Sequence, residues 1–399
     1  MFACDRLAMR FLPIVALGVL GSTAWAQSPP LDPSDPAAAT AASPDETPGP
    51  DVAGEDADQT TAPDLATTAK QAKPAKPAKQ AKQGRAKKVQ VSGFLTAMYK
   101  FRVDHDGDGK VEPDAFRIGK AVVRFSGKID RHLGYVIEID PRSPTLIGVL
   151  RDGYITVRKL IPHHELRIGQ QKTPWGYENW QSSTALYFTS RTELSEGLGR
   201  GLTHRDLGVG LVGKVPLSEG LRLEDAIAVV NGDGFGVQGD TTHLKNVWGH
   251  LGVRYRAGDW VIHAGASGAI GDQIEPADPG QPPNPRTGFR RLGADLEVDH
   301  PWAFLGAEYA IGANEDPAES GMTETEQAYF VTLAVKTPWH LGPVARYDAA
   351  DLEGFSRWTV GGYWGEPGAR VRAFVDYEYF EDDLGKHDAR VESQLQIVF

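Results

Sequence analysis

The stretch "VESQLQIVF" (391–399) decides the fold, because its side chains alternate up to its last residue. Glu392, Gln394 and Gln396 fall on one parity, and the other parity holds Val391, Ser393, Leu395, Ile397 and Phe399. Such alternation predicts a half-buried β-strand. The last residues of a chain usually fray, so a pattern kept up to its final residue predicts an end fixed within a sheet. A closed membrane barrel offers such a place, since it has no free edge.

Alternating segments of the same kind recur from Val89 onward, separated by polar turns. An even number of strands is what single-chain bacterial outer-membrane barrels require. We therefore predict an all-β fold, a transmembrane antiparallel β-barrel of about 16 strands. The predicted strands are 89–103, 115–129, 133–141, 148–160, 164–172, 204–216, 221–231, 246–257, 259–271, 289–300, 302–313, 325–337, 340–349, 354–364, 368–380 and 387–399.

The connections between these segments alternate in length, as in barrels with short periplasmic turns and long external loops. The short connections are 130–132, 216–220, 257–259, 299–301 and 337–339. The long connections are 104–114, 173–203, 231–245, 271–288 and 313–325. A soluble β-sandwich has no reason to sort its loops in this way.

The two faces of each segment also differ. Segment 289–300 places Leu292 and Leu296 opposite Arg291 and Asp295. In a membrane barrel the apolar face contacts lipid and the charged face lines the lumen, which agrees with a mean hydropathy of −0.35. Tryptophans near segment ends are expected in the aromatic girdles of such a barrel, namely Trp175, Trp248, Trp260, Trp302, Trp339, Trp358 and Trp364.

Residues 1–26 have the features of a cleaved secretory signal peptide. Arg6 and Arg10 precede a short apolar stretch, and "AWA" (24–26) supplies the small residues of a cleavage site. The only cysteine, Cys4, would leave with this peptide. Export and the barrel pattern predict the outer membrane of a Gram-negative bacterium, and the mature protein would have no thiolate metal site or cysteine nucleophile.

Residues 27–88 form a linker rich in proline, alanine and lysine, and they contain almost no large apolar side chain. Such a segment cannot bury a core, so we expect it to be disordered. Its basic run has two interpretations. It is a tether that contacts an anionic surface such as the cell wall, or it is a solvated linker. The residues that define the run are Lys73, Lys76, Lys79 and Lys82.

Three stretches resemble the phosphate-selective porin O and P family: "AFRIGKAVVRFSGKI" (115–129), "RDGYITVRKLIPHHELRIGQQKTPWGYENWQSS" (151–183) and "RDLGVGLVGKVP" (205–216). The resemblance implies a homotrimeric sixteen-stranded channel whose third external loop, here 173–203, folds inward to form a constriction. Where the family often has paired arginines, this chain has Gly119 and Lys120. This departure bears on the phosphate preference rather than on the fold.

The terminal Phe399 resembles the signature that the barrel-assembly machinery of bacteria reads in outer-membrane proteins. On an alternating final strand of an exported barrel, we therefore expect it to act as an assembly signal.

The charge pattern favours passage of anions, although the net charge of the chain is −11. On the faces assigned to the lumen, lysine and arginine outnumber aspartate and glutamate, and rings of such cations select anions. We predict a water-filled channel for passive diffusion of small anions such as phosphate or polyphosphate. The residues predicted to line the anion pathway are Lys120, Arg124, Arg158, Arg191, Arg200, Arg254 and Arg291.

Other functions remain open from the residues alone. The barrel could be a general, weakly selective porin, an outer-membrane enzyme or a cell-wall anchor. No catalytic constellation stands out at a meaningful spacing, so we expect no enzyme activity. We also expect no cofactor and no nucleic-acid partner; the partners predicted are membrane lipid and small anions.

One stretch resembles a calcium-binding loop. In "DHDGDGKVEPDA" (104–115), Asp104, Asp106 and Asp108 stand at the first, third and fifth ligand positions. The twelfth position, where a bidentate glutamate is needed, is Ala115. Aspartate and glycine are also typical of external turns, so calcium binding is the weaker interpretation, and no other metal site is predicted.

Overall fold

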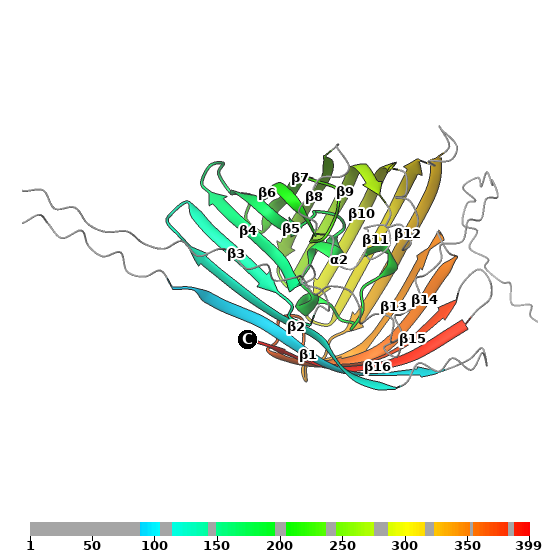
Figure 1. Ribbon diagram of the computed structural model, residues 1–399. Coiled ribbons are helices and arrows are strands. Elements are labelled where there is room, and N and C mark those ends of the chain that lie inside the picture. Colours follow the sequence, from blue (N-terminus) through cyan, green and yellow to red (C-terminus); the bar gives the residue numbers. More distant parts are fainter. Residues whose placement is uncertain are drawn as a thin grey trace, which may run out of the picture. The chain divides into compact units, whose positions relative to one another are not determined.

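The computed structural model describes residues 88–103, 114–142, 149–195, 205–236, 245–274, 286–315, 323–351, 354–381 and 387–399. In these residues sixteen antiparallel strands form one closed barrel, in which each strand pairs with its sequence neighbours and β1 pairs with β16 (Figure 1). The predicted fold is confirmed. The strands are β1 (Gln90–Val103), β2 (Ala115–Lys128), β3 (Leu133–Ile139), β4 (Leu150–Arg158), β5 (His164–Lys172), β6 (Arg205–Ser218), β7 (Leu221–Val230), β8 (Asn246–Ala257), β9 (Trp260–Ile274), β10 (Arg286–His300), β11 (Ala303–Glu315), β12 (Thr323–Val335), β13 (Leu341–Ala350), β14 (Phe355–Trp364), β15 (Val371–Glu381) and β16 (His387–Val398).

The barrel closes where β16 lies against β1. The backbone of Phe399 exchanges two hydrogen bonds with that of Gly93, at 2.9 and 3.0 Å. A side chain at position 93 would not fit, because a Cβ there would lie 2.2 Å from the carbonyl oxygen of Val122 and 2.9 Å from the Phe399 ring. The stretch 391–399 is thus paired within the sheet along its length.

The strand boundaries differ from the predicted ones mainly on the side of the long connections. β9 continues to Ile274, three residues beyond its predicted end, and β10 begins at Arg286, three residues before its predicted start. Their ladder runs without interruption from Arg286↔Ile274 to Asp299↔Val261. The added residues at the ends of β9 and β10 are mostly glycine and polar residues, which are typical of turns. Their backbone nevertheless pairs between the two strands, so the strands are longer than predicted.

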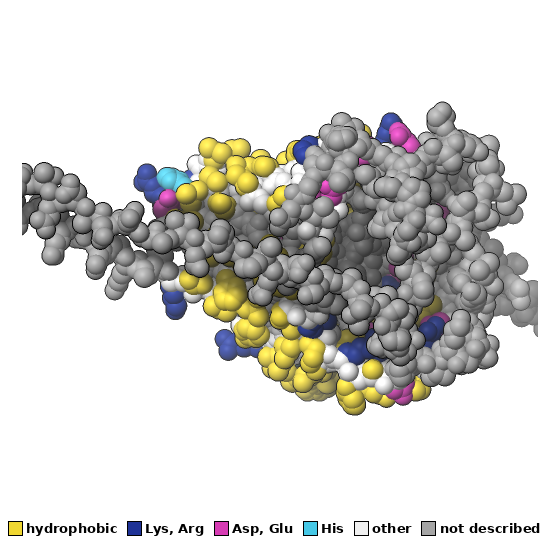
Figure 2. Space-filling view, viewed as in Figure 1, with side chains coloured by type: hydrophobic (Ala, Val, Ile, Leu, Met, Phe, Trp, Pro, Cys, Tyr) yellow, Lys and Arg dark blue, Asp and Glu magenta, His cyan; other side chains and the backbone are white. Residues whose placement is uncertain are grey.

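The outer face of the barrel is apolar and the inner face is largely polar. In β10, Leu292 and Leu296 are exposed on the outside, whereas Arg291 and Asp295 are buried inside, as their parity predicted. Figure 2 shows hydrophobic side chains over the outside of the described strands. Among the described residues, no helix has the length and hydropathy that crossing a bilayer requires.

Two of the tryptophans expected in the girdles lie inside the barrel instead. Trp175 and Trp248 are buried and pack edge to face, with ring centroids 6.0 Å apart. The prediction was wrong for these two because the inner wall carries aromatic residues as well as polar ones. The other five are exposed, as expected: Trp260, Trp302, Trp339, Trp358 and Trp364.

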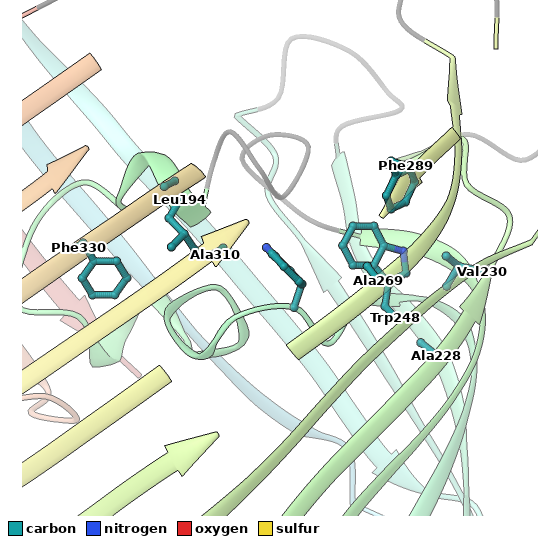
Figure 3. Packing of buried hydrophobic residues seen from close by; sticks show 10 residues of the cluster. Leu194, Ala228, Val230, Trp248, Ala269, Phe289, Ala310 and Phe330 are labelled. Atoms are coloured by element: carbon teal, nitrogen blue, oxygen red, sulfur yellow. The ribbon is translucent and has the colours of Figure 1, made fainter. Parts of the chain in front are cut away.

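The apolar packing inside the barrel lies between the wall and the segment that follows β5. One cluster joins Trp175 and Leu194 of this segment to side chains of β7–β12 (Figure 3). A second cluster joins Tyr187 and Phe188 to side chains of β12–β15. The core of this molecule is therefore a contact between a loop and one side of the barrel.

Candidate pore constriction

The segment 173–195, called the inner loop below, lies inside the barrel. It leaves β5 through Gly176, whose φ of 63° favours glycine, and contains the short helices α2 (Tyr177–Trp180) and η2 (Ser183–Ala185). The backbone N–H of Gly176 donates to the Ser267 hydroxyl of β9 at 3.0 Å. The inward fold that the family resemblance implied for loop 173–203 is thus present in the described part of that loop.

Three arginines of the wall hold the inner loop by its carbonyl oxygens. Arg346 of β13 donates to the carbonyl of Ser190 at 2.9 Å, and Arg357 of β14 donates to that of Arg191 at 2.6 Å. Arg372 of β15 donates to the carbonyls of Thr184 and Leu186, at 2.8 and 2.7 Å. These guanidinium groups are buried, so they stabilise the loop rather than meet a solute in the lumen.

Carboxylates of the wall hold the inner loop by its N–H groups. Asp348 of β13 accepts from the backbone of Glu193 at 3.1 Å, and it also pairs with Arg357 at 2.6 Å. Asp376 of β15 accepts from the backbone of Thr189 at 3.0 Å. Hydrogen bonds to charged partners are stronger than those between neutral groups. This side of the barrel therefore holds the inner loop through its backbone C=O groups, which accept from arginines, and through its backbone N–H groups, which donate to carboxylates.

A buried glutamate organises the loop from within. Glu178 accepts hydrogen bonds from the hydroxyls of Thr192 and Ser195, at 2.7 and 2.6 Å, and from the Thr192 backbone at 3.1 Å. Its own backbone N–H donates to Glu308 of β11.

Tyr187, farther along the loop, is buried against Tyr363 with ring centroids 5.0 Å apart, and burial raises the pKa of its hydroxyl.

The inner faces of β1–β5 are different, and we call them the open wall. In two of their ion pairs the cation is clearly more exposed than the acid, whereas in the pairs Arg151–Glu138 and Arg167–Glu165 the two partners are about equally exposed. Arg124 is 35% exposed against 12% for its partner Glu138, at 3.1 Å. Arg158 is 39% exposed against 21% for Glu165, at 2.6 Å. In these two pairs the guanidinium group is therefore more accessible than the carboxylate.

Three further cations extend the open wall towards the long connections. Lys100 of β1 lies 3.8 Å from the less exposed Glu392, and Arg102 pairs with Asp388 at 2.8 Å. Beyond β3, Arg142 binds Asp140 at 2.7 Å. Burial opposes ionisation of Asp140, but the hydrogen bonds and charge of Arg142 outweigh it and lower the pKa of this carboxyl group.

The residues predicted for the anion pathway fall into several environments. Lys120 and Arg124 are on the open wall, and Lys120 donates to Ser183 of the inner loop at 3.0 Å. Arg158 is at the end of β4 next to a short turn. Lys120 therefore marks a point where the open wall meets the loop.

The other predicted residues lie elsewhere. Arg191 is buried, and its guanidinium group donates to carbonyl oxygens of the inner loop, among them Gln181 at 2.9 Å. Arg254 lies between Glu224 and Glu297, at 3.5 Å from each. Arg291 is buried over the Phe289 ring. Arg200 and the calcium candidates Asp104, Asp106 and Asp108 lie outside the described residues.

Sequence reasoning missed a cluster on the inner face of β8–β10. His250, His263 and Asp295 bring three ligand atoms within 4.8 Å of one another. Each residue comes from a different strand, so no spacing within one segment signals the cluster. The parity of segment 289–300 did place Asp295 on the charged, lumen side, and the register between the strands brings the two histidines to it.

Comparison with known proteins supports the same architecture. No curated protein sequence matches the chain. The family model of phosphate-selective porin O and P matches residues 94–273, a range that holds β2–β8, most of β1 and β9, and the described inner loop.

Solved structures of barrel channels are similar in fold. An anion-selective porin from Comamonas acidovorans has a TM-score of 0.56 at 13% identity, and the match covers 78% of this chain and 100% of that one. OmpT of Vibrio cholerae, in its trimer form, has a TM-score of 0.55 at 14% identity, covering 79% and 100%. The outer membrane channel DcaP of Acinetobacter baumannii has a TM-score of 0.54 at 16% identity, covering 80% and 99%.

The family match and the barrel with its inward loop agree with each other. The chain therefore has the fold of a sixteen-stranded barrel channel, and over residues 94–273 it is similar to the phosphate-selective porin O and P family.

Proposed function

We propose that the protein lets small anions diffuse passively between the inner loop and the open wall. The observation that carries this proposal is the unequal exposure within the ion pairs of the open wall. Arg124 and Arg158 reach farther into the lumen than Glu138 and Glu165. Cations that line a pore select anions. In an ion pair this selection requires the cation to be more accessible to the solute than the carboxylate that neutralises it.

The same ion pairs keep the binding of an anion weak. Arg124 is already satisfied by Glu138 and by the Tyr154 hydroxyl at 3.1 Å. A passing anion therefore shares the guanidinium group with a carboxylate and does not replace it. Weak, repeated binding is what conduction requires, because an ion that binds strongly blocks the path. The charged groups from Arg102 through Lys120 and Arg124 to Arg158 offer such a series.

Phosphate and polyphosphate are the anions we propose first. The planar fork of arginine matches the oxygens of a phosphate group, and the family whose model matches residues 94–273 is described as phosphate-selective. The similar porin from Comamonas acidovorans is described as anion-selective, which supports the wider class of solute.

The same proposal includes the export, the assembly and the oligomeric state of the protein. The chain would be exported by the signal peptide 1–26, with Phe399 as its assembly signal. It would form a homotrimer in outer-membrane lipid, as the trimer form of OmpT suggests. The segment 27–88 would act as a linker whose basic run contacts the cell wall.

The test reverses charge on the open wall. In the double variant Lys120→Glu, Arg124→Glu, we expect the ratio of anion to cation permeability to fall at least about fivefold, since about 1 kcal/mol remains per charge after screening. Reversal potentials in a KCl gradient across planar bilayers measure this ratio. Phosphate added to the chloride solution should reduce the current of the wild type more than that of the variant.

The matched control is Arg131→Glu, which makes the same change of charge in the exposed turn between β2 and β3. It should keep the wild-type reversal potential. If the double variant also keeps it, the open wall does not select ions. The weakly selective general porin then becomes the better description, and the net charge of −11 favours that second candidate.

A further inference from the structure

We propose that His250, His263 and Asp295 form a binding site for a divalent transition-metal ion, zinc above all, in the inner wall of β8–β10. The Nε2 atom of His250 lies 3.0 Å from Oδ2 of Asp295, and that of His263 lies 2.8 Å from Oδ1. Two imidazoles and one carboxylate are ligands that zinc prefers. In a tetrahedral zinc site the ligand atoms are about 3.3 Å apart. The three ligand atoms here lie within 4.8 Å of one another, so the side chains would have to rearrange around a bound ion.

The backbone leaves room for these ligands at two glycines. A Cβ on Gly265 would lie 2.7 Å from Nε2 of His250 and 2.8 Å from Asp295. A Cβ on Gly252 would lie 2.5 Å from the His263 ring. The three ligand groups therefore gather directly over backbone that has no side chain, and any other residue at 265 would push the imidazole and the carboxylate apart.

The other nitrogen of His263 is the second observation that points to a ligand. His263 is completely buried, and its Nδ1 lies 3.5 Å from Oε2 of Glu224, a long contact. If the neutral ring carries its proton on Nε2, towards Asp295, then Nδ1 presents a lone pair to a carboxylate. A metal on Nε2 moves the proton to Nδ1, where it can be donated to Glu224. No proton is released or consumed in this change.

This arrangement of metal, histidine and carboxylate is common around zinc, since the outer carboxylate fixes the tautomer and orientation of the ligand. The ring of Tyr177 from the inner loop closes the site. It stacks on His263 with centroids 4.0 Å apart, and Arg254 in turn contacts the Tyr177 hydroxyl. The site lies apart from the open wall, so it does not depend on the proposed anion pathway.

The test counts the zinc that stays with the folded chain. The full-length protein is refolded in detergent with excess zinc, separated from free metal by gel filtration and analysed by elemental mass spectrometry. We expect one tightly held zinc ion per chain. His263→Gln and His250→Gln should reduce retention at least about tenfold, and Glu224→Gln should weaken affinity by about 10-fold. Glutamine keeps an N–H that can donate to Asp295, so these variants are expected to fold.

The matched control is His340→Ala, because this histidine is exposed and lies near a different acid, Glu366. It should retain the same zinc as the wild type, and heat-modifiable migration should be equal for all variants. Equal zinc in the wild type and in His263→Gln would mean that surface histidines bind the metal, and it would overturn the proposal. Absence of bound zinc from the wild type would overturn it as well.

Discussion

The two sides of the barrel interior use arginine in opposite ways. On β13–β15, Arg346, Arg357 and Arg372 are buried and donate to carbonyl oxygens of the inner loop. On the open wall, arginines such as Arg124 and Arg158 keep a third or more of their surface exposed. The same type of side chain therefore holds the inner loop on one side and lines the proposed path on the other. What decides between the two roles is whether the loop covers the residue.

The largest expected effect comes from removing a buried acid of the covered side. In Asp348→Asn, Arg357 loses its charged partner while it remains buried. Breaking one partner of a buried ion pair costs about 3–5 kcal/mol, so we expect a clear drop in the temperature at which the folded band converts to the unfolded band on gels. An unchanged temperature would show that this side does not depend on its buried pair.

The second prediction releases the loop from its apolar contacts. Tyr187→Ala combined with Phe188→Ala removes two buried rings that pack on β11–β15. The strand ladders stay intact, so the barrel should still fold, but the lumen should widen. We expect single-channel conductance to rise about two- to threefold, because conduction in a pore depends on its narrowest section.

The control for this variant is Trp260→Ala, which removes an exposed ring from the outer face. It should leave the conductance unchanged. If both variants conduct like the wild type, the inner loop does not limit the current, and the comparison between a covered and an open side loses its functional meaning.

The third prediction concerns the end of the open wall. Arg158→Gln removes a cation that is 39% exposed near a short turn. We expect the anion to cation permeability ratio to fall by about twofold, less than for the pair in the middle of the wall, since water screens charges better at a wide mouth. Raising the salt concentration should reduce the difference from the wild type. A difference that grows with salt would contradict a screened Coulomb effect.

The smallest effect is expected from the acid that faces Arg158. In Glu165→Gln, the ion pairs with Arg158 and Arg167 are lost, but all three groups are partly exposed. Exposed ion pairs contribute about 0–1 kcal/mol, so the unfolding temperature should hardly move, in contrast to Asp348→Asn. A loss as large as in Asp348→Asn would show that the open wall is as tightly built as the covered one.

The sequence was enough to predict the barrel because each strand carries its own signal. The alternation in "VESQLQIVF" and the opposition of Leu292 to Arg291 depend only on neighbouring residues, and the structure confirms both. The inner loop could be anticipated only through the family resemblance. Its contacts join residues more than a hundred positions apart, such as Arg372 and Thr184, and no local pattern encodes such pairings.

Parity also could not tell which inner residues the loop would cover. Arg346, Arg357 and Arg124 look alike in the sequence, as cations on the lumen face of a strand. Their different exposure follows from the position of the loop. Parity placed Asp295 inside but could not reveal that His250 and His263 of the two preceding strands lie beside it, because this depends on register.

The way in which the inner loop is anchored has a consequence for how the channel can change over evolutionary time. Arg346, Arg357 and Arg372 bind main-chain oxygens, which every amino acid provides. Substitutions at Thr184, Leu186 or Ser190 therefore keep these particular bonds while altering the chemistry that the loop presents. A constriction held in this manner can acquire a new solute preference by single mutations without first losing its attachment.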